Sequence, residues 1–87
     1  MYGLKERFGR AVRDLRLTRG LSQEKLAQRA KVSRNFVGSL ERGESSVSLD
    51  AADRIAKGLG TTLTELIRLT ESERAATQRG SIRSPRP

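Results

Sequence analysis

Apolar residues recur every three or four positions along most of the chain, which is the spacing of one face of an α-helix. The first such stretch predicts a helix over residues 3–18 that ends before Gly20. Its apolar positions are Leu4, Phe8, Ala11, Val12 and Leu15. Charged residues fill most positions between them, so this helix has one face for a protein core and one for solvent.

Four further helices are predicted from the same spacing and from the residues at their ends. Serine and threonine hydroxyls accept backbone N–H groups at the start of a helix, and glycine commonly ends one. The predicted spans are about 22–29, about 33–42, 49–58 and a short fifth helix, with N-caps at Ser22, Ser33, Ser48 and Thr62. Glu65 follows Thr62 by three residues, which matches the pattern of a capping box. Gly43 and Gly60 mark the ends of the third and fourth helices.

Only Lys31 and Val32 separate the second and third predicted helices. So short a connection makes two helices meet at a steep angle, as in a helix-turn-helix. Aromatic residues are only 3% of the chain, so the core must be built mainly from Leu, Val, Ile and Ala, which favours packed helices over sheets. The sequence therefore predicts a compact all-α fold of five helices.

From Thr70 onward the apolar periodicity fades while arginine stays frequent. We therefore expect one folded domain over residues 1–69 and a flexible basic tail over residues 70–87.

The charge of the chain points to a polyanionic partner. Lys and Arg number 18 against 10 Asp and Glu, which gives a net charge of +8 and a pI of about 11.3. Fourteen of the 18 cations are Arg, whose planar guanidinium pairs with phosphate and with base edges through two hydrogen bonds at a time. Ribosomal-type proteins, proteins that bind membrane surfaces and proteins that are simply basic share this composition. The composition therefore favours a nucleic-acid partner but does not establish one.

Other residue types narrow the class of protein. Cysteine is absent, which excludes disulfides and thiolate metal sites and is typical of a reducing cytoplasm. No apolar stretch approaches the length of a membrane span, and the first ten residues lack the apolar centre of a signal peptide. We expect a cytoplasmic protein with no membrane partner, no cofactor and no metal.

The third predicted helix has two different faces. If Val37 and Leu40 point toward the core, the helical period turns Arg34, Asn35 and Ser39 to the opposite side. Arg can bind guanine, Asn can bind adenine, and Ser can bond to several base edges. The outer face of this helix therefore has the chemistry needed to read DNA.

At these residues the chain resembles the lambda- and 434-repressor-like helix-turn-helix domains, also called the XRE type. The resemblance covers roughly residues 8–68 and rests on "LRLTRGLSQEKLA", "VSRNFVGSLERG" and "SLDAADRIAKGLGTTLTEL" in this order and spacing. It implies a bacterial or phage-type transcriptional regulator that binds double-stranded operator DNA as a homodimer, with the third helix in the major groove of a pseudo-palindromic site. In size the chain is also similar to the controller proteins of restriction-modification systems. A regulator that binds bacterial DNA would act at the nucleoid.

The resemblance assigns roles to particular residues. Base contacts are implied for Arg34, Asn35 and Ser39. Phosphate contacts are expected for Gln23, Ser33, Arg42 and Gly43, the first two because helix N-termini attract anions. An ion pair between the first helix and the end of the third is implied for Arg16 and Glu41.

The fifth predicted helix has more apolar residues than a short helix needs to dock on its own domain. We therefore expect it to form the dimer interface, through Leu63, Leu66, Ile67 and Leu69.

The chain departs from the family pattern at two positions. Lys31 stands where the tight turn usually has glycine, so this lysine must adopt a left-handed backbone conformation. Glu44 replaces the positive or neutral residues common in the phosphate-facing loop, which weakens the expected backbone contacts there. Gly38, on the outer face of the third helix, either permits a close approach to DNA or has no role.

Other functions are less compatible with the residues present. Histidine and cysteine are absent and the carboxylates are scattered over helix ends, so we expect no enzyme. The scarcity of aromatic residues for base stacking disfavours RNA binding and nonspecific nucleic-acid binding. A protein-interaction module, such as an antitoxin or adaptor that uses the same fold, remains the alternative.

Overall fold

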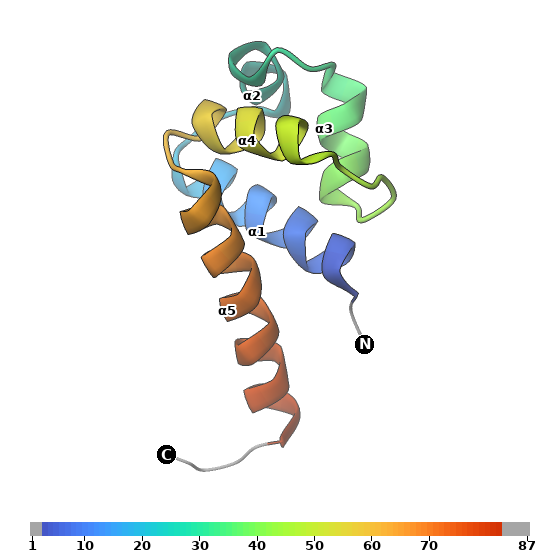
Figure 1. Ribbon diagram of the computed structural model, residues 1–87, viewed down its shortest axis with the longest axis vertical. Helices are drawn as coiled ribbons and strands as arrows, with labels where there is room; N and C mark the ends of the chain where they lie inside the picture. Colours follow the sequence, from blue (N-terminus) through green and yellow to red (C-terminus); the bar gives the residue numbers. More distant parts are fainter. Residues whose placement is uncertain (1–2, 83–87) are drawn as a thin grey trace.

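Five α-helices follow one another in the computed structural model, which describes residues 3–82 and the side chains of residues 3–72 (Figure 1). They are α1 Leu4–Thr18, α2 Gln23–Ala30, α3 Arg34–Glu41, α4 Leu49–Gly58 and α5 Leu63–Ile82. No strand interrupts them within residues 3–82. The prediction of an all-α fold with five helices is confirmed.

The helices begin at the predicted capping residues. The hydroxyls of Ser22, Ser33 and Ser48 each accept the backbone N–H three residues ahead, at 3.0 to 3.1 Å. Thr62 Oγ1 accepts the N–H of Glu65 in the same way, whereas the Glu65 carboxylate accepts two hydrogen bonds from Arg68. Local hydrogen bonding at a helix start therefore accounts for where four of the five helices begin.

The core lies where α1 to α4 cross, and α5 packs on α1 and α4. Its fully buried apolar side chains are Val12, Leu26, Ala30, Val37, Leu40, Ile55, Ala56, Leu59 and Leu66. Because every helix contributes to this cluster, α3 is held firmly along one side and has the other side at the surface.

A contact between two backbones fixes the distance between α1 and α3. A Cβ atom at Gly9 would lie 2.2 Å from the carbonyl oxygen of Leu40 and 3.1 Å from that of Glu41. No side chain can occupy that space, so the glycine lets the last turn of α3 rest directly on α1.

The turn between α2 and α3 has the strained residue that the sequence predicted. Lys31 adopts the left-handed conformation, with φ 60° and ψ 46°. This conformation lets the N–H of Val32 reach the carbonyl oxygen of Ala27 at 3.0 Å, which closes the end of α2. The lysine thus makes a turn that glycine would make without steric cost.

The fifth helix is longer than predicted. It continues to Ile82, so its expected end near residue 69 is wrong, and residues 70–82 are helical where we expected a flexible tail. Thr70 is completely buried and donates a hydrogen bond from its hydroxyl to the carbonyl oxygen of Leu66. Apolar periodicity is the signal of a packed face, so its loss after residue 70 hid a stretch whose Ala, Glu, Gln and Arg residues favour helix by themselves. Residues 83–87 lie outside the described residues.

Candidate nucleic-acid interface

Helix α3 presents the two faces that its sequence predicts. Val37 and Leu40 are completely buried, while Arg34 and Asn35 are exposed in the first turn. Ser33, the N-cap of this helix, is exposed as well. Two long polar side chains and a helix N-terminus therefore face solvent together, with donors suited to base edges and to phosphate.

Ser39 lies on the same outer side but already has a partner. Its hydroxyl is hydrogen bonded to the hydroxyl of Ser45 in the loop after α3, and Ser39 is only partly exposed. A base contact by Ser39 would therefore share this hydroxyl with Ser45, a constraint that sequence reasoning missed.

Gly38 is buried, although its place on the helix suggested an exposed position. A Cβ atom there would lie 3.2 Å from Nη1 of Arg42 and within 3.9 Å of the Gln23 amide group. The side chains of Arg42 and Gln23 therefore cover this glycine. Neither of the two roles considered for Gly38 included making room for neighbouring side chains.

A buried network connects α1, α2 and α3. The Arg16 guanidinium donates from Nε to Glu41 Oε2 at 2.6 Å and from Nη2 to Glu41 Oε1 at 3.0 Å. The two side chains are only 9% and 3% exposed, and Arg16 also donates to the carbonyl oxygen of Leu21 at 2.9 Å. Its hydrogen bond to the Glu41 carboxylate raises the pKa of Arg16, against the opposing effect of burial. The structure therefore contains the ion pair that the resemblance implied, in a doubly hydrogen-bonded form.

Gln23 belongs to the same network. Its Nε2 donates to Glu41 Oε1 at 3.1 Å, so one carboxylate oxygen accepts hydrogen bonds from α1 and from α2. Gln23 is partly exposed at the start of α2, beside the covered Gly38. The ion pair thus fixes the position of a side chain expected at a phosphate, a connection that single-residue motifs did not reveal.

Arg42, directly after α3, is paired with Glu44 in the following loop. The Arg42 Nε donates to Glu44 Oε2 at 3.0 Å, and both side chains are more than half exposed, at 61% and 57%. This hydrogen bond raises the pKa of Arg42 and lowers the pKa of Glu44. The arginine expected at a phosphate therefore already has an anionic partner within the protein.

Gly43 is buried and makes the turn that ends α3. It has a φ of 74°, and its N–H donates to the carbonyl oxygen of Leu40 at 3.0 Å. The amide expected at a phosphate is therefore used inside the protein, and Gly43 shapes the loop rather than presenting a free donor.

The four apolar residues assigned to a dimer interface have different environments. Leu66 is 0% exposed and belongs to the core, so it cannot touch a partner without unfolding. Leu63 and Leu69 are partly buried against the same core, whereas Ile67 is 41% exposed. Of these four residues, Ile67 is exposed, Leu63 and Leu69 are partly exposed, and Leu66 is not available at the surface.

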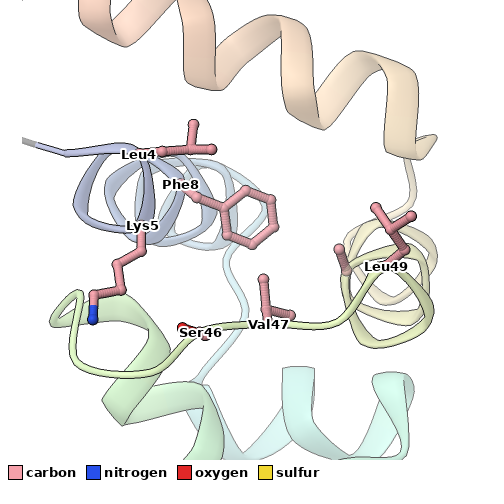
Figure 2. A pocket seen from close by; sticks show the side chains of 7 residues that line it. Leu4, Lys5, Phe8, Ser46, Val47 and Leu49 are labelled. Carbon is pink, nitrogen blue, oxygen red and sulfur yellow. The ribbon is translucent and has the colours of Figure 1, made fainter.

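An apolar pocket of about 300 Å³ lies between the first turn of α1, the loop after α3 and the start of α4 (Figure 2). It is lined by Leu4, Lys5, Phe8, Ser46, Val47, Leu49 and Ala52. In Figure 2 the ring of Phe8 and the side chain of Val47 face the hollow, and Leu4 and Leu49 flank it. Lys5 is the one ionisable residue of this lining, which lacks the paired groups that acid–base chemistry requires.

Two further observations concern the described part of the chain. None of its helices is both long enough and apolar enough to cross a lipid bilayer. Its acidic residues form no cluster of three or more that could hold a metal ion.

The helix-turn-helix geometry of α2 and α3 agrees with a comparison to known families. The helix-turn-helix model HTH_3 matches residues 12–66, which include α2, α3 and α4 entirely. The chain belongs to this family. In this helix-turn-helix protein α3 is the second helix of the motif, which in such proteins enters the DNA groove.

Relatives of this helix-turn-helix protein are gene regulators. Control protein C.BamHI of Bacillus amyloliquefaciens is 41% identical over 64 residues, which are 72% of this chain and 79% of that protein. Control protein C.MunI of Mycoplasma sp is 39% identical over 74 residues, 84% of this chain and all of that protein. The crystal structure of the restriction-modification controller protein C.AhdI from Aeromonas hydrophila superimposes with a TM-score of 0.72 at 40% identity, over 75% of this chain and 98% of that one. The protein is a DNA-binding transcriptional regulator of the helix-turn-helix family.

Proposed function

We propose that this regulator recognises a specific operator in double-stranded DNA as a homodimer, with α3 in the major groove of each half-site. The observation that carries this proposal is the exposed pair Arg34 and Asn35 on the outer face of α3, opposite the buried Val37 and Leu40. Because the inner face is fixed in the core, the outer side chains can meet base edges in a constant orientation.

The remaining contacts divide between bases and phosphates. Arg34 and Asn35 read base edges, and Ser39 adds a contact shared with Ser45. Gln23, Ser33 and Arg42 surround this face and bind phosphates, which position the protein without carrying sequence information. Gly43 contributes by shaping the loop, since its N–H is bonded to Leu40.

The homodimer rests on α5. Ile67 is exposed on this helix, with Leu63 and Leu69 partly exposed beside it. Two copies joined there would place two α3 helices on half-sites about one helical turn apart. Since the relatives C.BamHI and C.MunI are control proteins and C.AhdI is a restriction-modification controller protein, we propose that the regulator controls the transcription of restriction-modification genes in the bacterial cytoplasm, at the nucleoid.

Selection from a pool of random-sequence duplexes, followed by sequencing of the bound fraction, tests this function. We expect two related half-sites with defined bases. Arg34→Ala should then cost on the order of 1–3 kcal/mol on the selected site and relax the preference at one base pair per half-site, a G·C pair by the chemistry of arginine. Gln23→Ala should weaken binding to all sequences about equally, because a phosphate has no base identity.

Melting curves serve as the control, since both residues lie off the apolar core and neither variant should unfold. A folded Arg34→Ala protein that keeps the complete wild-type base preference would show that α3 does not read DNA through this residue. A wild-type protein that enriches no sequence would contradict the proposed function as a whole.

A further inference from the structure

The guanidinium of Arg42 lies along the outer face of α3, although its Cα is beyond the end of the helix. Side chains lean toward the N-terminus of a helix, which directs Arg42 back over the preceding turn. There it covers Gly38, with Nη1 3.2 Å from the position that a Cβ atom would have. The same space brings it near the Gln23 amide group. The absence of a side chain at Gly38 thus places a cation in the middle of the DNA-facing surface.

Glu44, in the loop after α3, holds this cation through a hydrogen bond. Its carboxylate accepts a hydrogen bond from the Arg42 Nε at 3.0 Å, and both residues are exposed. Glu44 is fixed by the turn, because its own N–H donates to the carbonyl oxygen of Ser39 at 3.0 Å. Arg42 therefore lies between the slot over Gly38 and a carboxylate that the backbone positions.

A DNA phosphate and the Glu44 carboxylate compete for the same guanidinium. Each has a pair of anionic oxygens, with which the arginine fork can form two parallel hydrogen bonds. A phosphate that approaches Arg42 must break its bond to Glu44, and it also meets the negative charge of the freed carboxylate. Exposed ion pairs are weak, so DNA can displace this one, but part of the binding free energy is lost in doing so.

Resting on the proposed function, we infer that Glu44 is an affinity-setting residue that acts through Arg42, by occupying in the free protein the guanidinium that DNA binding requires. Glu44 thereby limits binding to DNA of any sequence, because a phosphate contact is the same everywhere along the duplex. Arg34 and Asn35 determine the base preference of the regulator, while Glu44 lowers its affinity for random DNA.

The experiment measures binding to random-sequence duplexes of about 30 base pairs, roughly three helical turns, by fluorescence anisotropy. Glu44→Gln should tighten binding about two- to fivefold per subunit, the range that corresponds to an exposed ion pair. In an Arg42→Ala background the same substitution should have less than half of that effect on the logarithm of Kd, since the residue through which it acts is gone. Arg42→Ala alone should weaken binding.

Glu24→Gln is the matched control. Glu24 is an exposed glutamate in the first turn of α2, so its substitution removes the same charge from another element of the helix-turn-helix. Its effect on Kd should be equal with and without Arg42. An equal effect in both backgrounds would show that removing a negative charge does not by itself depend on Arg42. The dependence of Glu44→Gln on Arg42 would then be specific to this pair.

An NMR titration without DNA gives an independent readout. The hydrogen bond from Arg42 holds the pKa of Glu44 below its usual value, so Arg42→Ala should raise that pKa. A Glu44 pKa that stays unchanged in Arg42→Ala would overturn the inference, because the pair would then not exist in solution.

Two binding results would overturn it as well. One is a Glu44→Gln effect of equal size in the wild-type and Arg42→Ala backgrounds, which would mean that Glu44 repels DNA directly. The other is weaker DNA binding by Glu44→Gln, which would mean that Glu44 orients Arg42 for its contact with DNA. Either result leaves the proposed function intact if the wild type still selects an operator. A protein without operator preference would remove the function and this inference together.

Discussion

Among single residues, the buried pair of Arg16 and Glu41 contributes to stability and also positions other parts of the protein. Three helices meet at this carboxylate, which accepts hydrogen bonds from Arg16 in α1 and Gln23 in α2 while belonging to α3. A nearly buried ion pair is costly to break, because the remaining charge cannot return to water. The pair therefore fixes how α1 meets α3 and where Gln23 points.

We predict that Glu41→Gln lowers the free energy of unfolding by about 3 kcal/mol, the lower end for a broken buried pair, because a glutamine oxygen can still accept one bond from Arg16. Arg16→Met combined with Glu41→Leu should recover part of this loss, since neither charge is then left unpaired. Urea unfolding of the three proteins measures both effects. Unchanged stability of Glu41→Gln would mean that the pair contributes nothing to the fold.

At the scale of elements, the turn between α2 and α3 shows a local conflict that the surrounding fold imposes. Left-handed backbone is unfavourable for any residue with a Cβ atom, by roughly 1–2 kcal/mol. Lys31 nevertheless adopts it, because Val32 must bond to Ala27 and α3 must return to the core within two residues. The helix-turn-helix geometry therefore prevails over the preference of one exposed lysine.

Lys31→Gly should accordingly stabilise the protein by about 0.5–1 kcal/mol, the relief of left-handed strain less the extra entropy of glycine in the unfolded chain. Gln28→Gly is the matched control, because Gln28 is exposed inside α2 and the same new residue should there cost about 1 kcal/mol. Thermal melting of the two variants gives opposite signs if this account is correct. Destabilisation by both would show that Lys31 makes a contact worth more than its strain.

At the scale of the whole molecule, α5 gives the protein its elongated form. The described chain measures 42 × 22 × 21 Å, and in Figure 1 the second half of α5 extends beyond the other four helices. The first half of α5 is held by packing of one face, through Leu63, Leu66 and Leu69, on the core. The proposed contact with a second copy of the chain lies on the first half of this helix, where Ile67 is exposed.

Ile67→Glu should shift the protein from dimer to monomer in sedimentation experiments, because it places a charge on the exposed apolar side of α5. The melting temperature should change little, since Ile67 is already 41% exposed. Leu49→Glu is the control: it introduces the same charge at a 77% exposed leucine at the start of α4 and should leave the dimer intact. A wild-type monomer at high micromolar concentration would contradict the proposed assembly.

Features governed by neighbours in sequence could be predicted. The caps at Ser22, Ser33 and Ser48 depend on hydrogen bonds across three residues, and the two faces of α3 follow from helical periodicity. The ion pair between Arg16 and Glu41 was available only through family resemblance, because 25 residues separate the partners.

Features governed by the path of a side chain could not be predicted. Gly38 has a position typical of an exposed residue, and it is buried because Arg42 and Gln23 turn over it. Leu66 looked available to a partner because periodicity identifies an apolar face without saying what covers it. The end of α5 was misplaced for the converse reason, since a helix can continue after its apolar face has ended.

The contact of α1 and α3 at Gly9 bears on how such regulators diverge. Because two backbones touch there, the orientation of α3 does not depend on side chains that could repack after a substitution. Arg34 and Asn35 lie outside the core, so descendants of this protein can exchange them without rebuilding the scaffold, and under the proposed function such exchanges would change the operator. Position 9 has no such freedom, since every other amino acid would push the recognition helix away from its support. The base preference of such a regulator can thus change during evolution, while the orientation of α3 stays the same.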